Sequence, residues 1–169
     1  MITEVHDWVA RQVAHLQPEG PVLEVGSYDV NGSVRDLFPD PYLGVDLRPG
    51  PGVDLVADAG MTELERKFNA LVCVETLEHC RYPVDVLANM CRAALPGAVF
   101  IGTWPFLFPL HDYPSDYWRA TPEGFKVALE EAGFTDIDTE LLWGTHSVAT
   151  ARVPADVVTV TQEQEAVTA

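Results

Sequence analysis

Four acidic residues lie within or directly after apolar runs in the first half of the chain. Glu24, Asp46, Asp58 and Glu75 accompany the runs VLEV, YLGV, VDLVA and FNALVCV. Continuous apolar runs are typical of buried parallel strands, whose carboxyl ends meet at the edge of the sheet where ligands bind. Carboxylates repel a pyrophosphate but accept hydrogen bonds from hydroxyl and amino groups. The spacing therefore predicts a site for a cationic, hydroxyl-rich ligand.

Each carboxylate suits one part of such a ligand. Asp46 follows Gly26 by 20 residues, the usual offset for an acid that accepts hydrogen bonds from a ribose. Asp58 ends the next strand and would accept from an adenine amino group. Glu24 would order the backbone amides of the loop VGSYDVNG, and its charge is compatible with a nearby sulfonium. S-adenosylmethionine combines a ribose, an adenine, an ammonium and a sulfonium, so these positions predict it as the cofactor.

The elements that must position these residues alternate between helix and strand. Apolar periodicity and turn residues predict helices over residues 2–16, 31–38, 83–94 and 122–133. Strands are predicted over residues 21–26, 41–46, 53–58, 68–75, 97–104, 134–143 and 146–153. This order favours a parallel α/β sheet covered on both faces. We expect a single domain over residues 1–161 and a frayed tail over residues 162–169.

Several segments together carry a family resemblance. The stretches VLEVGSYDVNGS, YLGVD, LVADA, FNALVCVETLEH and LANMCRAALPGAVFIGT resemble the class I S-adenosylmethionine-dependent methyltransferases, over about residues 20–135. The segment after the fourth strand is similar to quinone-biosynthesis methyltransferases, and PLHDYPSDYWRATPEGF resembles a segment of small bacterial methyltransferases. The resemblance implies a Rossmann-like three-layer sandwich. Its seven-stranded sheet would be mostly parallel, with the last strand antiparallel.

The resemblance also implies which residues contact the cofactor. The methionine part would lie against the loop after the first strand, the ribose beyond the second, and the adenine beyond the third. The matching positions, with those that line the pocket after the fourth strand, are Glu24, Gly26, Ser27, Tyr28, Gly32, Asp46, Leu47, Asp58, Ala59, Val74, Glu75 and His79. The family's usual loop has three glycines at alternating positions. Here Tyr28 occupies a position usually kept bare, so we interpret the loop as a longer variant.

The loop after the fifth strand, TWPFLFPLHDYPSDYWRATP, is the candidate for substrate binding and catalysis, because long ordered loops tend to be functional. His111 is the candidate general base, with Asp112 or Asp116 to orient it. Arg119 would bind a carboxylate or phosphate of the substrate. The residues that would wall an apolar pocket are Trp104, Tyr113, Tyr117 and Trp118. The alternative is that this segment packs the loop onto the sheet, with Arg119 paired to Asp116.

Composition disfavours several classes of partner. The net charge of −16 repels nucleic acid. No apolar run reaches the length of about 18 residues that a membrane span requires. The N-terminal segment is acidic and amphipathic, unlike a signal peptide, and the three cysteines lack metal-ligand spacing. We therefore expect a cytoplasmic protein without nucleic-acid or membrane partners.

The combined pattern predicts an S-adenosylmethionine-dependent methyltransferase acting on a small molecule. Transfer to oxygen is favoured over nitrogen because of the candidate base His111. No metal is expected, since no acid cluster suggests a magnesium site. The chain lacks a lid insertion, which leaves room for a homo-oligomer to complete the site. The alternatives are a catalytically silent scaffold, favoured by Tyr28, and a nicotinamide-dependent oxidoreductase, which needs three glycines.

Overall fold

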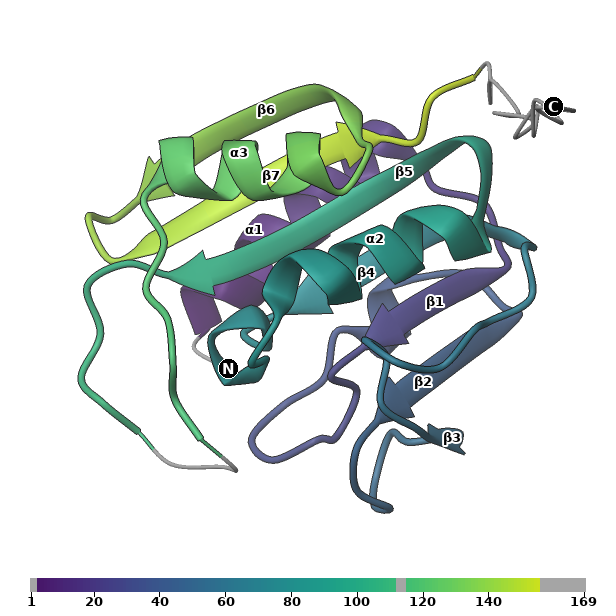
Figure 1. Ribbon diagram of the computed structural model, residues 1–169, viewed down its shortest axis with the longest axis horizontal. Helices are drawn as coiled ribbons and strands as arrows, with labels where there is room; N and C mark the ends of the chain where they lie inside the picture. The colour runs from purple at the N-terminus through teal and green to yellow at the C-terminus, as the bar shows by residue number, and fades with distance from the viewer. Residues whose placement is uncertain (1–2, 112–114, 156–169) are drawn as a thin grey trace, which may run out of the picture.

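Seven strands form one sheet in the computed structural model, which describes residues 3–111 and 115–155 (Figure 1). The strands are β1 (Val22–Val25), β2 (Tyr42–Asp46), β3 (Leu55–Val56), β4 (Phe68–Val74), β5 (Ala94–Pro105), β6 (Thr135–Leu142) and β7 (His146–Arg152). Their spatial order is β3-β2-β1-β4-β5-β7-β6. β7 pairs antiparallel with β5 and β6, and the other neighbouring pairs are parallel. The predicted sheet is confirmed.

The central strands are apolar because both faces of the sheet are covered. In β4, Leu71 and Cys73 belong to one core, whereas Ala70 and Val72 belong to the core on the opposite face. All four side chains are buried. A strand whose successive side chains enter two different cores carries no alternation of polar and apolar residues. Burial on both faces therefore explains the continuous apolar runs from which these strands were predicted.

Three α-helices within the described residues form the outer layers (Figure 1). α1 (Thr3–Leu16) covers one face, where Trp8 and Val9 pack into the smaller core. α2 (Pro83–Ala93) and α3 (Pro122–Glu131) cover the other face, where Leu87 and Phe125 are fully buried. The helix predicted over residues 2–16 is present from Thr3 to Leu16, and residue 2 lies outside the described residues. None of these helices combines the length and apolar character that crossing a membrane requires.

The helix predicted over residues 31–38 is wrong. This segment contains one 3-10 turn, η1 (Arg35–Leu37). Local side chains compete for the backbone, because the Asp29 carboxylate accepts a hydrogen bond from the Gly32 amide and the Ser33 hydroxyl accepts one from the Arg35 amide. The Arg35 guanidinium also donates to Asp54 at 2.8 Å, which fixes the turn beside β3.

Two strands, β3 and β5, differ from the prediction by more than one residue at an end. β3 has only two residues, because Asp58 and the residues after it turn back on themselves through backbone bonds from Met61 and Thr62 to Asp58. β5 begins three residues earlier than expected, at Ala94, which pairs with Phe68 across a register shift in β4. α3 begins as predicted, with the Thr121 hydroxyl accepting a hydrogen bond from the Gly124 amide at 3.0 Å.

Gly26 closes β1 and brings three strands together. Its φ of +85° is a left-handed conformation that suits glycine. The amides of Gly26 and Ser27 both donate to the carbonyl of Val45, at 2.9 and 3.2 Å. A Cβ at Gly26 would lie 1.9 Å from the hydroxyl oxygen of Thr76, which follows β4. The ends of β1, β2 and β4 therefore approach closely only because this position has no side chain.

The acidic residue Glu24 belongs to β1, and its carboxyl group is buried. Its side chain is only 5% exposed, and its neighbours include Tyr42 and Arg35. Burial raises the pKa of this carboxyl from 4.5 to about 7, although Tyr42 and Arg35 both oppose the shift. Burial likewise raises the pKa of the Tyr42 hydroxyl. The folded protein therefore binds a proton at Glu24 that the unfolded chain has already lost near pH 6.

We expect Gly26→Ala to destabilise the protein more than Gly97→Ala. Both glycines have a positive φ, so each substitution carries the cost of a left-handed alanine, roughly 1–2 kcal/mol. Nothing lies within 4 Å of a Cβ at Gly97, whereas Thr76 blocks the one at Gly26. The free energy of unfolding, measured with urea, gives the comparison. Equal losses would contradict the close contact between Gly26 and Thr76.

We expect the free energy of unfolding to fall as the pH rises from about 4.5 to about 7, because only the folded state retains the Glu24 proton in this range. Glu24→Gln would remove this contribution and leave the variant more stable relative to wild type above pH 7, by about 3 kcal/mol for the full shift. Urea unfolding at several pH values measures the difference. Glu19→Gln, at an exposed position, is the control, and a difference independent of pH would contradict the prediction.

Candidate functional site

A cavity of about 560 Å³ lies where β1, β2 and β4 end. We call it the main cavity. The predicted cofactor residues that line it are Gly26, Tyr28, Asp46, Leu47, Asp58, Ala59, Glu75 and His79. A smaller hollow of about 100 Å³, the loop hollow, adjoins it and is lined by the remaining predicted residues, Glu24, Ser27, Gly32 and Val74. Gly26, Tyr28 and Glu75 border both spaces, so the fold brings all the predicted cofactor residues to one region.

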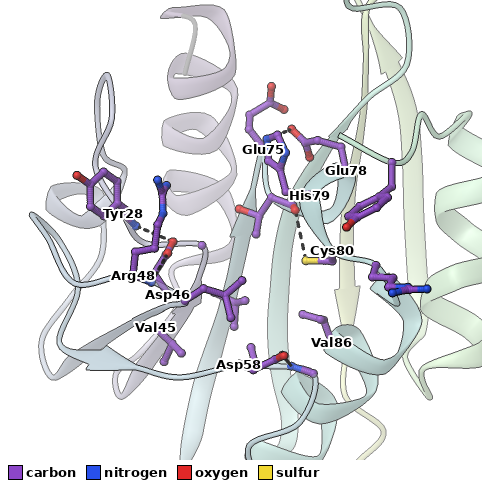
Figure 2. Close-up of a pocket in the computed structure, with 18 of the residues that line it drawn as sticks. Tyr28, Val45, Asp46, Arg48, Asp58, Glu75, Glu78, His79, Cys80 and Val86 are labelled. Atoms are coloured by element: carbon purple, nitrogen blue, oxygen red, sulfur yellow. Dashed lines mark hydrogen bonds and ion pairs between the residues drawn. The ribbon is translucent and has the colours of Figure 1, made fainter. Parts of the chain in front are cut away.

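Asp46 is held in place at the end of β2 by backbone amides. One carboxylate oxygen, Oδ2, accepts from the Tyr28 amide at 3.3 Å, and Oδ1 accepts from the Arg48 amide at 3.1 Å. Figure 2 shows Asp46 beside Tyr28 and Arg48, across the cavity from Glu75, Glu78 and His79. Because two amides from different loops fix the carboxylate, its orientation is set before any ligand binds.

The Tyr28 ring packs on the segment that follows β2. A Cβ at Gly50 would lie 2.0 Å from a ring carbon of Tyr28, and the Arg48 guanidinium lies 4.7 Å from the centre of the ring (Figure 2). Tyr28 stands where the family's loop usually has a glycine, and the lack of a side chain at Gly50 makes room for its ring. The Tyr28 ring forms part of the cavity wall and packs against Arg48 and Gly50 of the segment after β2.

Asp58 lies at another edge of the cavity, next to Val86 in the view of Figure 2. Its Oδ1 accepts from the Gly60 amide at 2.9 Å, which orients the carboxylate. Ala59 is buried, and its carbonyl accepts a hydrogen bond from the Asn89 side chain of α2 at 2.8 Å. This contact ties the turn after β3 to the helix that covers the sheet.

Glu75 follows β4 in a conformation that is uncommon for a residue with a side chain, with φ at +50°. Its Oε1 accepts from the Thr103 hydroxyl at 2.7 Å, and its Oε2 lies 3.1 Å from Nε2 of the buried His146. The Thr103 hydroxyl of β5 therefore orients this carboxylate by a hydrogen bond, and the buried His146 of β7 lies beside it. Backbone strain of this kind is concentrated at functional sites. The sequence analysis missed Thr103 and His146, since neither belongs to a local motif.

Glu78 is the principal site residue that the sequence analysis missed. It lies in the 3-10 turn η2 (Leu77–His79), and its side chain is fully buried. Its Oε1 is 3.6 Å from Nε2 of His79 and 3.8 Å from Nε2 of His111. Burial raises the pKa of the Glu78 carboxyl well above its usual value, and the nearby Glu75 carboxylate raises it further. The sequence signal that could have identified Glu78 was its spacing, because it follows Glu75 by three residues and directly precedes His79.

The loop after β5 brings His111 to the main cavity and Asp116 to His111. Nδ1 of His111 lies 3.2 Å from Oδ2 of Asp116, which also accepts from the His111 amide at 3.0 Å. Asp112, one predicted partner of His111, lies outside the described residues. Asp116, the other predicted partner, does contact His111.

Arg119 ties the two arms of this loop together. Its guanidinium pairs with both oxygens of Asp116 and donates to the carbonyls of Phe108, Pro109 and Trp118. The hydrogen bond from Arg119 is the main cause of the lowered pKa of the Asp116 carboxyl. This pairing is the structural alternative considered for Arg119, and it commits the guanidinium to partners within the chain.

The predicted aromatic wall is only partly present. Tyr117 lines the main cavity, and its amide donates to the carbonyl of Glu78 at 2.7 Å. Trp118 is not part of the lining, and its indole nitrogen donates to the carbonyl of Cys80. The position expected for Trp104 needs correction, because its ring is buried in the core, 5.5 Å from Phe125. Inward-facing residues of β5 enter the core beneath α3. Tyr113 lies outside the described residues.

No protein-family model matches the sequence, and no curated protein matches it. Solved structures do share its fold. One is 1,6-didemethyltoxoflavin-N1-methyltransferase from Burkholderia thailandensis, with bound 1,6-didemethyltoxoflavin and S-adenosylhomocysteine. It matches with a TM-score of 0.75 and 18% identity, over 90% of this chain and 79% of that chain.

Two further structures show the same fold. Phosphoethanolamine N-methyltransferase 2 from Haemonchus contortus, in complex with S-adenosylmethionine, has a TM-score of 0.64 and 15% identity, over 89% of this chain and 56% of that chain. A possible histamine N-methyltransferase from Thermotoga maritima has a TM-score of 0.62 and 18% identity, over 88% of this chain and 91% of that chain. The strand order and these similarities together show that the chain has the class I S-adenosylmethionine-dependent methyltransferase fold.

Proposed function

We propose that the protein is an S-adenosylmethionine-dependent methyltransferase that acts on a small molecule. The observation that carries the proposal is the carboxylate of Asp46, fixed by two amides at the end of β2 and facing a cavity of about 560 Å³. That volume is typical of small-molecule sites, roughly 300–1,000 Å³. A carboxylate in this position suits the two hydroxyls of a ribose.

The other residues around the two spaces fit the remaining parts of the cofactor. Asp58, oriented by the Gly60 amide, suits the adenine amino group. The loop hollow holds two buried oxygens, Oε2 of Glu24 and Oγ of Ser27, that have no hydrogen-bond partner within the described residues. Buried polar atoms without partners are rare in folded proteins. The ammonium of a methionine group supplies donors for them.

The bound cofactor supplies an electrophilic methyl group, and the chain must place an acceptor behind it and exclude water. Glu75 borders both the loop hollow and the main cavity, which supports an acceptor side near the end of β4. His111 and Tyr117 reach this side from the loop after β5. His111 is a candidate to accept a hydroxyl proton, because imidazole is basic near neutral pH.

We favour oxygen over nitrogen as the acceptor atom because His111 is a candidate general base. A hydroxyl group must lose its proton during transfer, which a nearby histidine assists. The similar structures include N-methyltransferases, so they support methyl transfer as the reaction class without favouring oxygen.

We expect purified protein to bind S-adenosylmethionine and S-adenosylhomocysteine saturably in calorimetric titrations. Asp46→Asn keeps the size of the side chain but removes its charge, and we expect it to weaken binding roughly 10- to 100-fold through the loss of charge-assisted hydrogen bonds. Asp138→Asn, at an exposed position on β6, is the matched control. A wild-type protein that binds neither ligand would overturn the proposal, and equal binding by the Asp46 variant would overturn its ribose assignment.

We expect transfer to hydroxylated acceptors and not to amines. A panel of phenols, sugars, hydroxy acids and amines, with release of S-adenosylhomocysteine as the measurement, tests this preference. If His111 acts as the base, His111→Gln lowers the turnover of the active acceptor by a factor on the order of 10² to 10⁴ while leaving cofactor binding intact. Turnover of amines alone would contradict the preference for oxygen. Cofactor binding without turnover of any acceptor would support the silent-scaffold alternative.

A further inference from the structure

Three potential metal ligands converge beside the main cavity. Glu78, His79 and His111 each offer one atom, and these atoms all lie within 4.8 Å of one another. Nε2 of His79 and Nε2 of His111 are the atoms that approach Glu78, at 3.6 and 3.8 Å from its Oε1. His79 and His111 both line the cavity, as does Glu78. We call these three residues the Glu-His-His cluster.

The far side of each imidazole already has a partner. Nδ1 of His79 lies 2.7 Å from the carbonyl oxygen of Ser115. Nδ1 of His111 lies 3.3 Å from the carbonyl oxygen of Pro109, its hydrogen-bond partner, and 3.2 Å from Oδ2 of Asp116. When Nδ1 carries the proton and donates to these oxygens, Nε2 keeps its lone pair. Histidines that bind metals are held in this way, with the second nitrogen donating to a carbonyl or a carboxylate. Both rings therefore present Nε2 toward the same point.

The surroundings of the cluster carry excess negative charge. Glu78 is fully buried, and neither of its carboxylate oxygens has a hydrogen-bond partner within the residues that the structure describes. Glu75 and Asp116 are close enough to repel its charge. Arg119 is the nearby cation in this network, and it is already paired with Asp116. Among the residues that the structure describes, the imidazoles of His79 and His111 approach the Glu78 carboxyl, and a bound cation would satisfy its oxygens.

We propose that Glu78, His79 and His111 bind a divalent transition-metal ion, with the open coordination position facing the main cavity. Two imidazoles and one carboxylate suit zinc, iron and related ions rather than magnesium, which prefers oxygen ligands. Ligands of a tetrahedral zinc ion lie about 3.3 Å apart, given bond lengths of about 2.0–2.1 Å. The observed separations are 3.6 and 3.8 Å for the two pairs that include Glu78, and all three atoms lie within 4.8 Å of one another, so the side chains must move inward to bind one ion.

The use of this metal in the reaction rests on the proposed function. Three protein ligands leave a position for water or for an oxygen of the acceptor, and a bound metal acidifies a hydroxyl group. In this arrangement Nε2 of His111 is a ligand and does not accept the proton itself. The metal site thus replaces the simpler hypothesis of His111 as a general base and retains the preference for an oxygen acceptor.

The experiment measures metal binding directly, without cofactor or acceptor. Tag-free protein stripped with a chelator is titrated with Co²⁺, whose visible absorption reports ligation by imidazole and carboxylate, and then with Zn²⁺ as a competitor. We expect one equivalent of Co²⁺ to bind and Zn²⁺ to displace it. Glu78→Gln and His111→Gln are each expected to abolish the absorption. His15→Gln, at an exposed histidine in the last turn of α1, is the matched control and should bind like wild type.

The outcomes separate this inference from the proposed function. Absence of Co²⁺ absorption in the folded wild type, or unchanged absorption in either folded cluster variant, overturns the metal site. Circular dichroism of each variant shows whether it is folded, and a folded His111→Gln variant alone is sufficient because this residue is on a surface loop. Calorimetry of the metal-free protein with S-adenosylhomocysteine tests the cofactor site independently. Metal binding with no cofactor binding would leave the metal site standing and refute the methyltransferase.

Discussion

The structure depends on the parallel pairing of β1 with both β2 and β4. This pairing places the last residues of three strands at one edge, where Gly26 allows the chain segments to approach closely. The amides of Gly26 and Ser27 share the carbonyl of Val45, and the Tyr28 amide binds Asp46. Backbone geometry at the end of β1 therefore determines where the carboxylates of two other strands lie.

Much of this arrangement could be predicted from the sequence, because the signals are local. Apolar runs that contain or end in an acid located β1, β2 and β4, and the two residues of the Gly26–Asp46 offset line the cavity that we propose for the cofactor. The segment over residues 31–38 had an apolar pattern that a helix would share, but the side chains of Asp29 and Ser33 bind the backbone that a helix needs. Competition of this kind depends on conformation and is weakly encoded in periodicity.

The acceptor side could be predicted less well, because its contacts join residues far apart in the chain. Glu75 is oriented by Thr103 and lies beside His146, and no spacing rule connects these positions. Trp104 resembled a pocket residue in composition, yet the alternation of β5 directs it into the core. The expectation of no metal rested on acid clusters and cysteine spacings, whereas the group around Glu78 includes two histidines from separate segments that the fold brings together.

The loop after β5 and the turn after β4 are joined by several bonds. The Tyr117 amide binds the carbonyl of Glu78, the Trp118 indole binds the carbonyl of Cys80, and the His79 ring contacts the carbonyl of Ser115. The two segments therefore form one wall. Exchanging the loop alone for that of another enzyme would break these bonds and displace Glu78. Any redesign of this side of the cavity therefore has to replace the two segments together, because neither keeps its conformation without the bonds to the other.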